Sequence, residues 1–138
     1  MTPITGGCLC RQVRFEFSAP PITMRLCWCR DCQYFANGNA TVNVVFPSDA
    51  LRIEGELRDF QSQADSGNRM HRRFCPNCGT HVFSGAESRP HLVIVRNGAL
   101  DDTALLKPSA TIWTESAPAW AWVDETLPMH PGQPPPIA

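Results

Sequence analysis

The sequence predicts a mainly β domain whose strands are held together by metal-binding cysteines. Several short stretches either alternate apolar and polar residues or are rich in β-branched residues, and helical patterns are scarce. Seven cysteines fall into three tight clusters. At 138 residues the chain is one ordinary domain, which buries about two-thirds of its unfolded surface.

The strand predictions rest on local pattern. The stretch from Gln12 to Phe17 alternates, with Val13 and Phe15 on one side, as in a half-buried strand. Gly55 divides two further strand patterns and indicates a hairpin or a bend. The predicted strands span residues 12–17, 41–46, 51–54, 57–63, 70–74, 80–84 and 91–96.

The remaining elements are a loop, a turn and one short helix. Residues 64–68 read as a loop, and Asn97-Gly98 is a strong turn signal after the most apolar strand. The best helix candidate is a short turn from Arg30 to Phe35. Five prolines among residues 128–138 predict an extended tail with no packing role. We therefore expect one zinc-binding β domain over residues 1–127, followed by this tail.

Charge and hydropathy exclude several functions. The net charge is −1, with eleven Arg and a single Lys, so no broad cationic surface is available for nucleic acid. No stretch approaches the roughly 18 apolar residues of a membrane span. The N-terminus carries no basic segment followed by an apolar run, which argues against a secretory signal. We expect a cytoplasmic protein with reduced thiols and no nucleic-acid or membrane partner.

The cysteine clusters predict metal sites and not disulfides. Disulfides are rare in a reducing compartment, and an odd number of cysteines would leave one thiol over. Cys27, Cys29 and Cys32 lie within six residues, so one ion can reach all three sulfurs. Three protein ligands leave a fourth position open for water or substrate, as in catalytic zinc sites. Alternatively, a His or Asp from elsewhere closes the site and its metal is purely structural.

The other four cysteines would form a closed, structural site. Cys8 and Cys10 would meet Cys75 and Cys78 across 64 intervening residues, much more than the roughly 15–20 of a compact zinc ribbon. Spacing alone also allows a second pairing, in which Cys29-x-x-Cys32 joins Cys75-x-x-Cys78. The first pairing is preferred because it keeps the contiguous trio intact.

Other polar and aromatic residues have a structural and a functional interpretation. The basic run from Arg69 to Arg73 could hold the carboxylates of a peptide substrate, but a solvated strand face is the favoured interpretation. His81 is expected to be a structural histidine. Trp28, between two ligands, is expected to wall the trio site. Core packing is the favoured role for three other tryptophans, Trp113, Trp120 and Trp122.

The clusters resemble a known family. Gly6-Gly7-Cys8-Leu9-Cys10, Cys27-Trp28-Cys29-Arg30-Asp31-Cys32-Gln33 and Phe74-Cys75-Pro76-Asn77-Cys78-Gly79-Thr80 occur in the order and spacing of the glutathione-dependent formaldehyde-activating enzymes. That family also includes centromere protein V. Residues 97–102 and 112–120 match as well. The chain differs at Trp28 and Thr111, where many members have histidine.

The resemblance implies both a fold and an activity. The family fold is a β-tent of antiparallel sheets. The family pattern assigns a structural zinc to Cys8, Cys10, Cys75 and Cys78, and a catalytic zinc to Cys27, Cys29 and Cys32. The named activity adds glutathione to formaldehyde and gives S-hydroxymethylglutathione.

Two functions from different classes follow from the sequence. The first is a carbon–sulfur lyase type enzyme with two zinc ions per chain, acting on a small thiol such as glutathione. The alternative is a non-enzymatic, zinc-scaffolded module that binds other proteins. The oligomeric state and the identity of the substrate-binding residues are not predicted.

Overall fold

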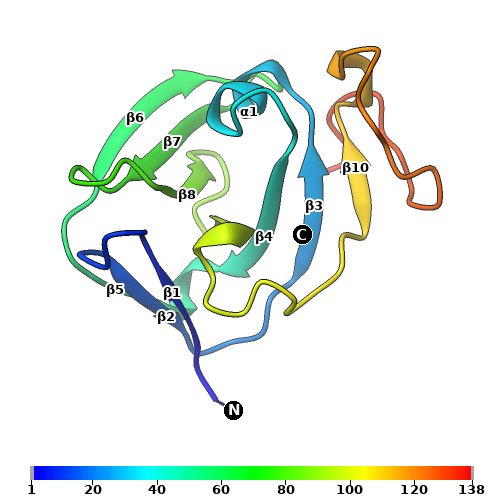
Figure 1. Ribbon diagram of the computed structural model, residues 1–138. Coiled ribbons are helices and arrows are strands. Elements are labelled where there is room, and N and C mark those ends of the chain that lie inside the picture. The colour runs from blue at the N-terminus through cyan, green and yellow to red at the C-terminus, as the bar shows by residue number, and fades with distance from the viewer. Residues whose placement is uncertain (1, 138) are drawn as a thin grey trace.

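The computed structural model describes residues 2–137 as two β-sheets and one short α-helix (Figure 1). The predicted mainly β fold class is confirmed. The strands are β1 (Ile4–Gly7), β2 (Arg14–Phe17), β3 (Thr23–Cys27), β4 (Thr41–Pro47), β5 (Leu51–Glu54), β6 (Arg58–Gln63), β7 (Arg69–Phe74), β8 (His81–Ala86), β9 (Leu92–Arg96) and β10 (Ala110–Ile112). The helix α1 spans Arg30–Phe35. None of the helices in residues 2–137 is long and apolar enough to cross a membrane.

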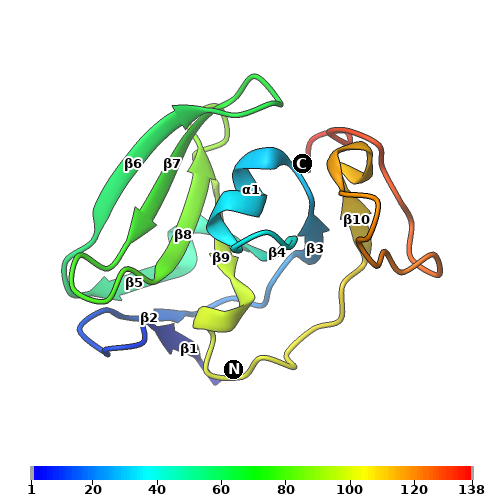
Figure 2. The same cartoon turned by 45° about the horizontal axis from the view of Figure 1, so that its top comes forward.

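The strands form a small sheet and a large one. The small sheet has the order β1-β2-β5 and is antiparallel. The large sheet has the order β10-β3-β4-β9-β8-β7-β6, and among these seven strands only β10 and β3 pair in parallel. Figure 2 shows the large sheet curving so that its two ends, β6 and β10, lie on either side of α1. This curvature creates a concave side, which α1 partly fills.

Most of the predicted strands and the helix lie where the pattern indicated. Gly55 makes a bend and not a hairpin, because β5 belongs to the small sheet and β6 to the large one. Its φ of 100° suits glycine, and an added Cβ would clash with the Gln12 carbonyl oxygen. Three strands escaped the sequence analysis: β1, β3 and β10. They are short or contain glycine and mixed polar residues, so they lack a clear alternation.

The core lies between the small sheet and the convex face of the large one. The predicted alternation of β2 is confirmed, since Val13, Phe15 and Phe17 are buried. Phe17 stacks on Phe46 of β4 at a centroid distance of 3.9 Å. Phe15 meets Phe83 of β8 edge to face at 5.0 Å. These aromatic contacts join the two sheets through apolar burial.

The C-terminal segment corrects one expectation. Residues 128–137 were predicted to have no packing role, and that is wrong. Five backbone hydrogen bonds join residues 128–132 to residues 111–115, and Thr111 forms a parallel bridge with Met129. The segment therefore continues the edge of the large sheet beside β10.

Replacing Phe46 by alanine should destabilise the fold strongly. The ring is fully buried in its stack on Phe17, so Phe46→Ala should lower the free energy of unfolding by about 3–5 kcal/mol. Urea unfolding at fixed metal content measures this value. Phe60→Ala is the matched control, because that ring is 53% exposed on β6 and its loss should change stability by less than about 0.5 kcal/mol. Equal losses in the two variants would contradict the proposed core.

Candidate metal centres and their pocket

The structure brings the seven cysteines together in two groups, each of which could hold a metal ion. The quartet of Cys8, Cys10, Cys75 and Cys78 and the trio of Cys27, Cys29 and Cys32 each have all their sulfurs within 4.8 Å of one another. All seven cysteines are free of disulfides. The alternative pairing of the middle cluster with Cys75 and Cys78 does not occur in this geometry.

The quartet links the two sheets. Cys8 and Cys10 lie in the turn after β1, and Cys75 and Cys78 lie in the turn between β7 and β8. The Sγ atoms of Cys8 and Cys10 are 3.5 Å apart, and those of Cys10 and Cys75 are 3.7 Å apart. Four sulfurs at about 2.3 Å from one tetrahedral ion would be about 3.8 Å from each other. The sulfur positions therefore fit a four-coordinate metal.

The backbone of the quartet is shaped for this arrangement. Val13 donates its backbone N–H to Cys8 Sγ at 3.3 Å, and Asn77 donates to Cys75 Sγ at 3.4 Å. Such N–H groups stabilise sulfur in its thiolate form. Gly79 follows the second ligand with a φ of 77°, a conformation that closes the turn back to Cys75 and that side chains rarely adopt.

The trio is assembled where β3 ends and α1 begins. Cys27 is the last residue of β3, and Cys29 caps the N-terminus of α1. The Cys29 sulfur accepts the backbone N–H of Cys32 at 3.3 Å. This cap places the two sulfurs on the same side of the first helical turn. All three side chains are buried, and Ile112 of β10 and Trp113 pack against them.

The surroundings of the three thiols shift their pKa values in different directions. Hydrogen bonds from Cys27 and Cys29 lower the pKa of Cys32 to about 2, and the positive charge of Arg96 acts in the same direction. Hydrogen bonds to Cys29 and Cys32, together with burial, raise the pKa of Cys27 far above its ordinary value. Three thiolates at this spacing would need a cation to offset their repulsion, and a metal ion bound by the three sulfurs would supply it.

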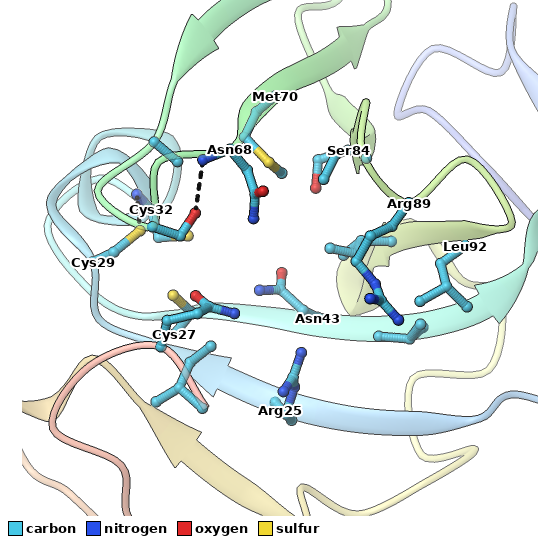
Figure 3. A pocket seen from close by; sticks show the side chains of 18 of the residues that line it. Arg25, Cys27, Cys29, Cys32, Asn43, Asn68, Met70, Ser84, Arg89 and Leu92 are labelled. Carbon is cyan, nitrogen blue, oxygen red and sulfur yellow. Dashed lines mark hydrogen bonds between the residues drawn. The ribbon is translucent and has the colours of Figure 1, made fainter. Parts of the chain in front are cut away.

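The trio opens into a pocket on the concave face of the large sheet (Figure 3). The floor follows the strand register, since Arg25 of β3 pairs with Asn43 of β4, and Asn43 pairs with Arg96 of β9. Alternate residues of the same strands, such as Met24 and Val44, point into the core on the other side. The pocket volume of about 180 Å³ is more than ten times the roughly 10–15 Å³ that one water needs. A small organic molecule therefore fits beside the trio.

Arginines line this pocket. Figure 3 shows that the side chains of Arg25 and Arg89 point into the pocket and lie at the end opposite the three cysteines. Neither of the two forms a side-chain hydrogen bond or ion pair with the residues that the structure describes. Arg96 donates its Nε–H to His81 Nδ1 at 3.3 Å and a second N–H to Asn43 Oδ1. Burial lowers the pKa of both Arg25 and Arg96, so an anion in the pocket would be favoured.

The predicted basic run separates into different environments. Arg69 is exposed, as expected of a solvated face. Arg72 is not, because it is 3% exposed, lines the pocket and donates to Ser62 and Asp31. His71 pairs with Asp59 at 2.6 Å on the outer side. The solvated-face interpretation is therefore wrong for Arg72.

The structural role expected of His81 is confirmed, and the role expected of Trp28 is corrected. His81 is structural, because its Nε2–H donates to the Phe83 carbonyl and its Nδ1 accepts from Arg96. Burial and the charge of Arg96 lower the pKa of His81 to about 3, so the ring is neutral at pH 7.

Trp28 is 3% exposed, but it is not among the residues that line the pocket, whereas Trp113 is. The ring beside the trio is thus Trp113, and Trp28 does not wall the pocket.

The core role expected of the tryptophans fails for two of them. Trp120 and Trp122 are 72% and 80% exposed. They lie between prolines and short turns after β10, where the chain has no sheet to cover them.

Sequence reasoning missed Arg25, Asn43, Arg89 and Arg96 as pocket residues. Arg25 precedes Cys27 by two residues on one strand, so it faces the same side, and this spacing was a usable signal. Asn43 interrupts an otherwise apolar, β-branched strand, which also marks a special position. Arg89 lies in a loop, and no local pattern identifies its role.

Comparison with known proteins agrees with this geometry. The family model of the glutathione-dependent formaldehyde-activating enzymes matches residues 3–116, which include all seven cysteines. The chain belongs to this family. None of the curated proteins matches the chain.

The fold of this family member also resembles a solved structure. A crystal structure of a Rhodobacter sphaeroides protein superposes with a TM-score of 0.57 at 21% identity, covering 75% of this chain and 91% of that chain. At this identity the likeness concerns the fold alone.

The two cysteine groups should respond differently to mutation. Metal analysis of the purified chain should give two ions, and Cys75→Ser and Cys32→Ser should each remove one. Cys75→Ser should destabilise the fold severely, since a four-thiolate site contributes on the order of 10 kcal/mol of apparent folding energy. Cys32→Ser should leave most of that stability, because the trio is local in sequence. Thermal unfolding with elemental analysis distinguishes them, and loss of the fold on removing the trio ion would contradict these roles.

Proposed function

We propose that this chain is a zinc-dependent enzyme that adds glutathione, or a closely related thiol, to formaldehyde and gives S-hydroxymethylglutathione. In class it is a carbon–sulfur lyase. The observation that carries the proposal is the opening of a buried three-cysteine group into an arginine-lined pocket, in a chain of the formaldehyde-activating family. The proposed location is cytoplasmic, where thiols and glutathione are reduced.

The proposal assigns a different role to each group of sulfurs. The quartet is the structural zinc site, because four protein ligands complete a tetrahedron and leave no position for substrate. The trio is the catalytic site, since three ligands leave one position open. Zinc bound there would lower the pKa of a coordinated thiol and so favour its nucleophilic form. The proposed structural ligands are Cys8, Cys10, Cys75 and Cys78, and the proposed catalytic ligands are Cys27, Cys29 and Cys32.

The arginines of the pocket support an anionic thiol. Arg25 and Arg89 lie in the pocket without a carboxylate partner among the described residues, at a cost in free energy that a bound anion would offset. Glutathione carries two carboxylates, and a guanidinium pairs with a carboxylate through two parallel hydrogen bonds. With its sulfur at the trio, such a substrate would extend its carboxylates towards Arg25 and Arg89.

The proposed reaction is a simple addition. The thiol sulfur forms a bond to the formaldehyde carbon, and the π electrons of the carbonyl pass to its oxygen. That oxygen takes up one proton, which replaces the proton lost from the thiol, so no oxidant or reductant is needed. The chain's contribution is to hold the two reactants together in a mostly enclosed pocket, which saves the entropy of their encounter.

The first test is an assay of the metal-loaded chain with glutathione and formaldehyde. Adduct formation, followed by NMR, should exceed the rate without enzyme, and Cys32→Ser should abolish that excess. The control is Tyr34→Phe, because this side chain is exposed on α1 and its change should leave the rate gain intact. A cysteine of the quartet is not a suitable control, since its replacement would remove a proposed structural ligand. A fully loaded chain with no rate gain over a panel of thiols and aldehydes would overturn the proposal.

A second test addresses the anionic end of the substrate. Arg25→Gln should raise KM for glutathione by about tenfold, equivalent to about 1.4 kcal/mol, while leaving KM for the uncharged 2-mercaptoethanol nearly unchanged. Arg58→Gln is the matched control, because Arg58 is exposed on β6. An equal effect on both thiols would mean that Arg25 acts on the fold and not on the substrate's charge.

The alternative is a zinc-scaffolded module that binds other proteins. The exposed pair of Trp120 and Trp122 favours it, since large exposed aromatic residues are enriched at interfaces. The arginine-lined pocket at the trio has no role in that function, so the enzyme is the better-supported proposal. The variant Trp120→Ser separates the two functions. If it loses binding to a protein partner but keeps full activity in the assay above, the chain has both functions.

A further inference from the structure

The C-terminal segment has a stiff part that reaches the pocket. Residues 128–132 are anchored beside β10 by the backbone hydrogen bonds described above. Beyond this anchor, Gln133 and all residues to Ile137 line the pocket together with the trio. In Figure 3 the segment, coloured red, approaches the pocket on the side of Cys27.

Specific contacts fix the start of this part. Trp113 donates its indole Nε1–H to Gln133 Oε1 at 3.0 Å, and Trp113 itself packs against the trio. Pro134 is buried. The wall of the pocket is therefore continuous from Ile112 through Trp113 to the proline run.

The composition of the segment suits a rigid apolar surface. Pro134, Pro135 and Pro136 have fixed φ values and form a stiff extended stretch. Pro134 is buried while Pro135 and Pro136 are exposed, and none of the three has a backbone N–H that would need a partner in the pocket.

We propose that residues Gln133–Ile137 form a rigid wall that limits the size of the molecules that reach the three cysteines. Across the pocket from this wall, the lining includes residues of the 64–68 loop and Arg89. The space between them has to admit any substrate on its way to the trio. The segment lies outside the residues 3–116 matched by the family model.

A size-dependent labelling experiment tests the wall without assuming any reaction. The chain as isolated is treated with N-ethylmaleimide or with a maleimide that carries a bulky aromatic dye, and labelled peptides are quantified by mass spectrometry. A chain truncated after Gly132 keeps the anchor beside β10 but lacks the wall. Its peptide containing Cys27, Cys29 and Cys32 should react about tenfold faster with the bulky reagent, a difference equivalent to about 1.4 kcal/mol. Its reaction with N-ethylmaleimide should change less than about twofold.

Two controls separate a size filter from general loosening. The peptide containing Cys75 and Cys78 is remote from the segment and should react equally in both chains. Met129→Ala alters the anchored part, whose side chain does not line the pocket, and should leave the ratio of the two rates unchanged. Equal acceleration by the small and the bulky reagent, or no acceleration by either, would overturn the proposal.

A second variant covers the case in which the truncated chain fails to fold. Pro135→Gly with Pro136→Gly keeps the length and the chain end but removes the stiffness. It should also raise the rate with the bulky reagent selectively, by less than the truncation does. An unchanged ratio in this variant would contradict the idea that rigidity matters.

The consequence for substrate choice rests on the proposed function. If the thiol addition proposed above takes place at the trio, the truncated chain should accept thiols bulkier than glutathione, with a raised kcat/KM for them relative to glutathione. A changed labelling ratio together with no thiol addition in either chain would leave the wall established and would overturn only the proposed function.

Discussion

The sulfur quartet joins turns of both sheets at one point, where a single metal ion could bind all four cysteines. The small sheet and the large sheet share an apolar core, and the quartet brings the turn after β1 against the turn between β7 and β8. The four sulfurs of these turns lie within 4.8 Å of one another, so one metal ion bound there would hold the turns at a fixed separation. The aromatic contacts of Phe15 and Phe17 then form on one side of the large sheet, and its other side is left concave.

The concave side is where the chemistry can take place. A strand has two faces, so each strand of the large sheet contributes to the core and to the pocket at once. On β3, for example, Met24 packs in the core while Arg25 and Cys27 face the pocket. The placement of Arg25, Asn43 and Arg96 in one row follows from register alone. The same register that builds the core therefore fixes the distance between the arginines and the three sulfurs.

How far the sequence predicts this arrangement depends on whether a signal is local. The alternation of β2, the short helix α1 and the division of the cysteines into a quartet and a trio are local or motif-based, and all are confirmed. The row of pocket residues depends on which strands are neighbours, which single-sequence patterns do not give. The C-terminal prolines were misjudged for a related reason. Proline lacks an N–H but keeps its carbonyl, so the chain around Pro128 and Pro131 can still accept hydrogen bonds from β10 and its flank.

We propose that the trio holds a metal with one position that a substrate thiol can occupy. A crystal structure grown with zinc and glutathione, with anomalous data at the zinc edge, tests it most directly. We expect one ion bound by the four sulfurs of the quartet. A second ion should be bound by Cys27, Cys29, Cys32 and the sulfur of glutathione, whose carboxylates should approach Arg25 and Arg89. A second ion closed by a fourth protein ligand, with glutathione absent from the pocket, would contradict it.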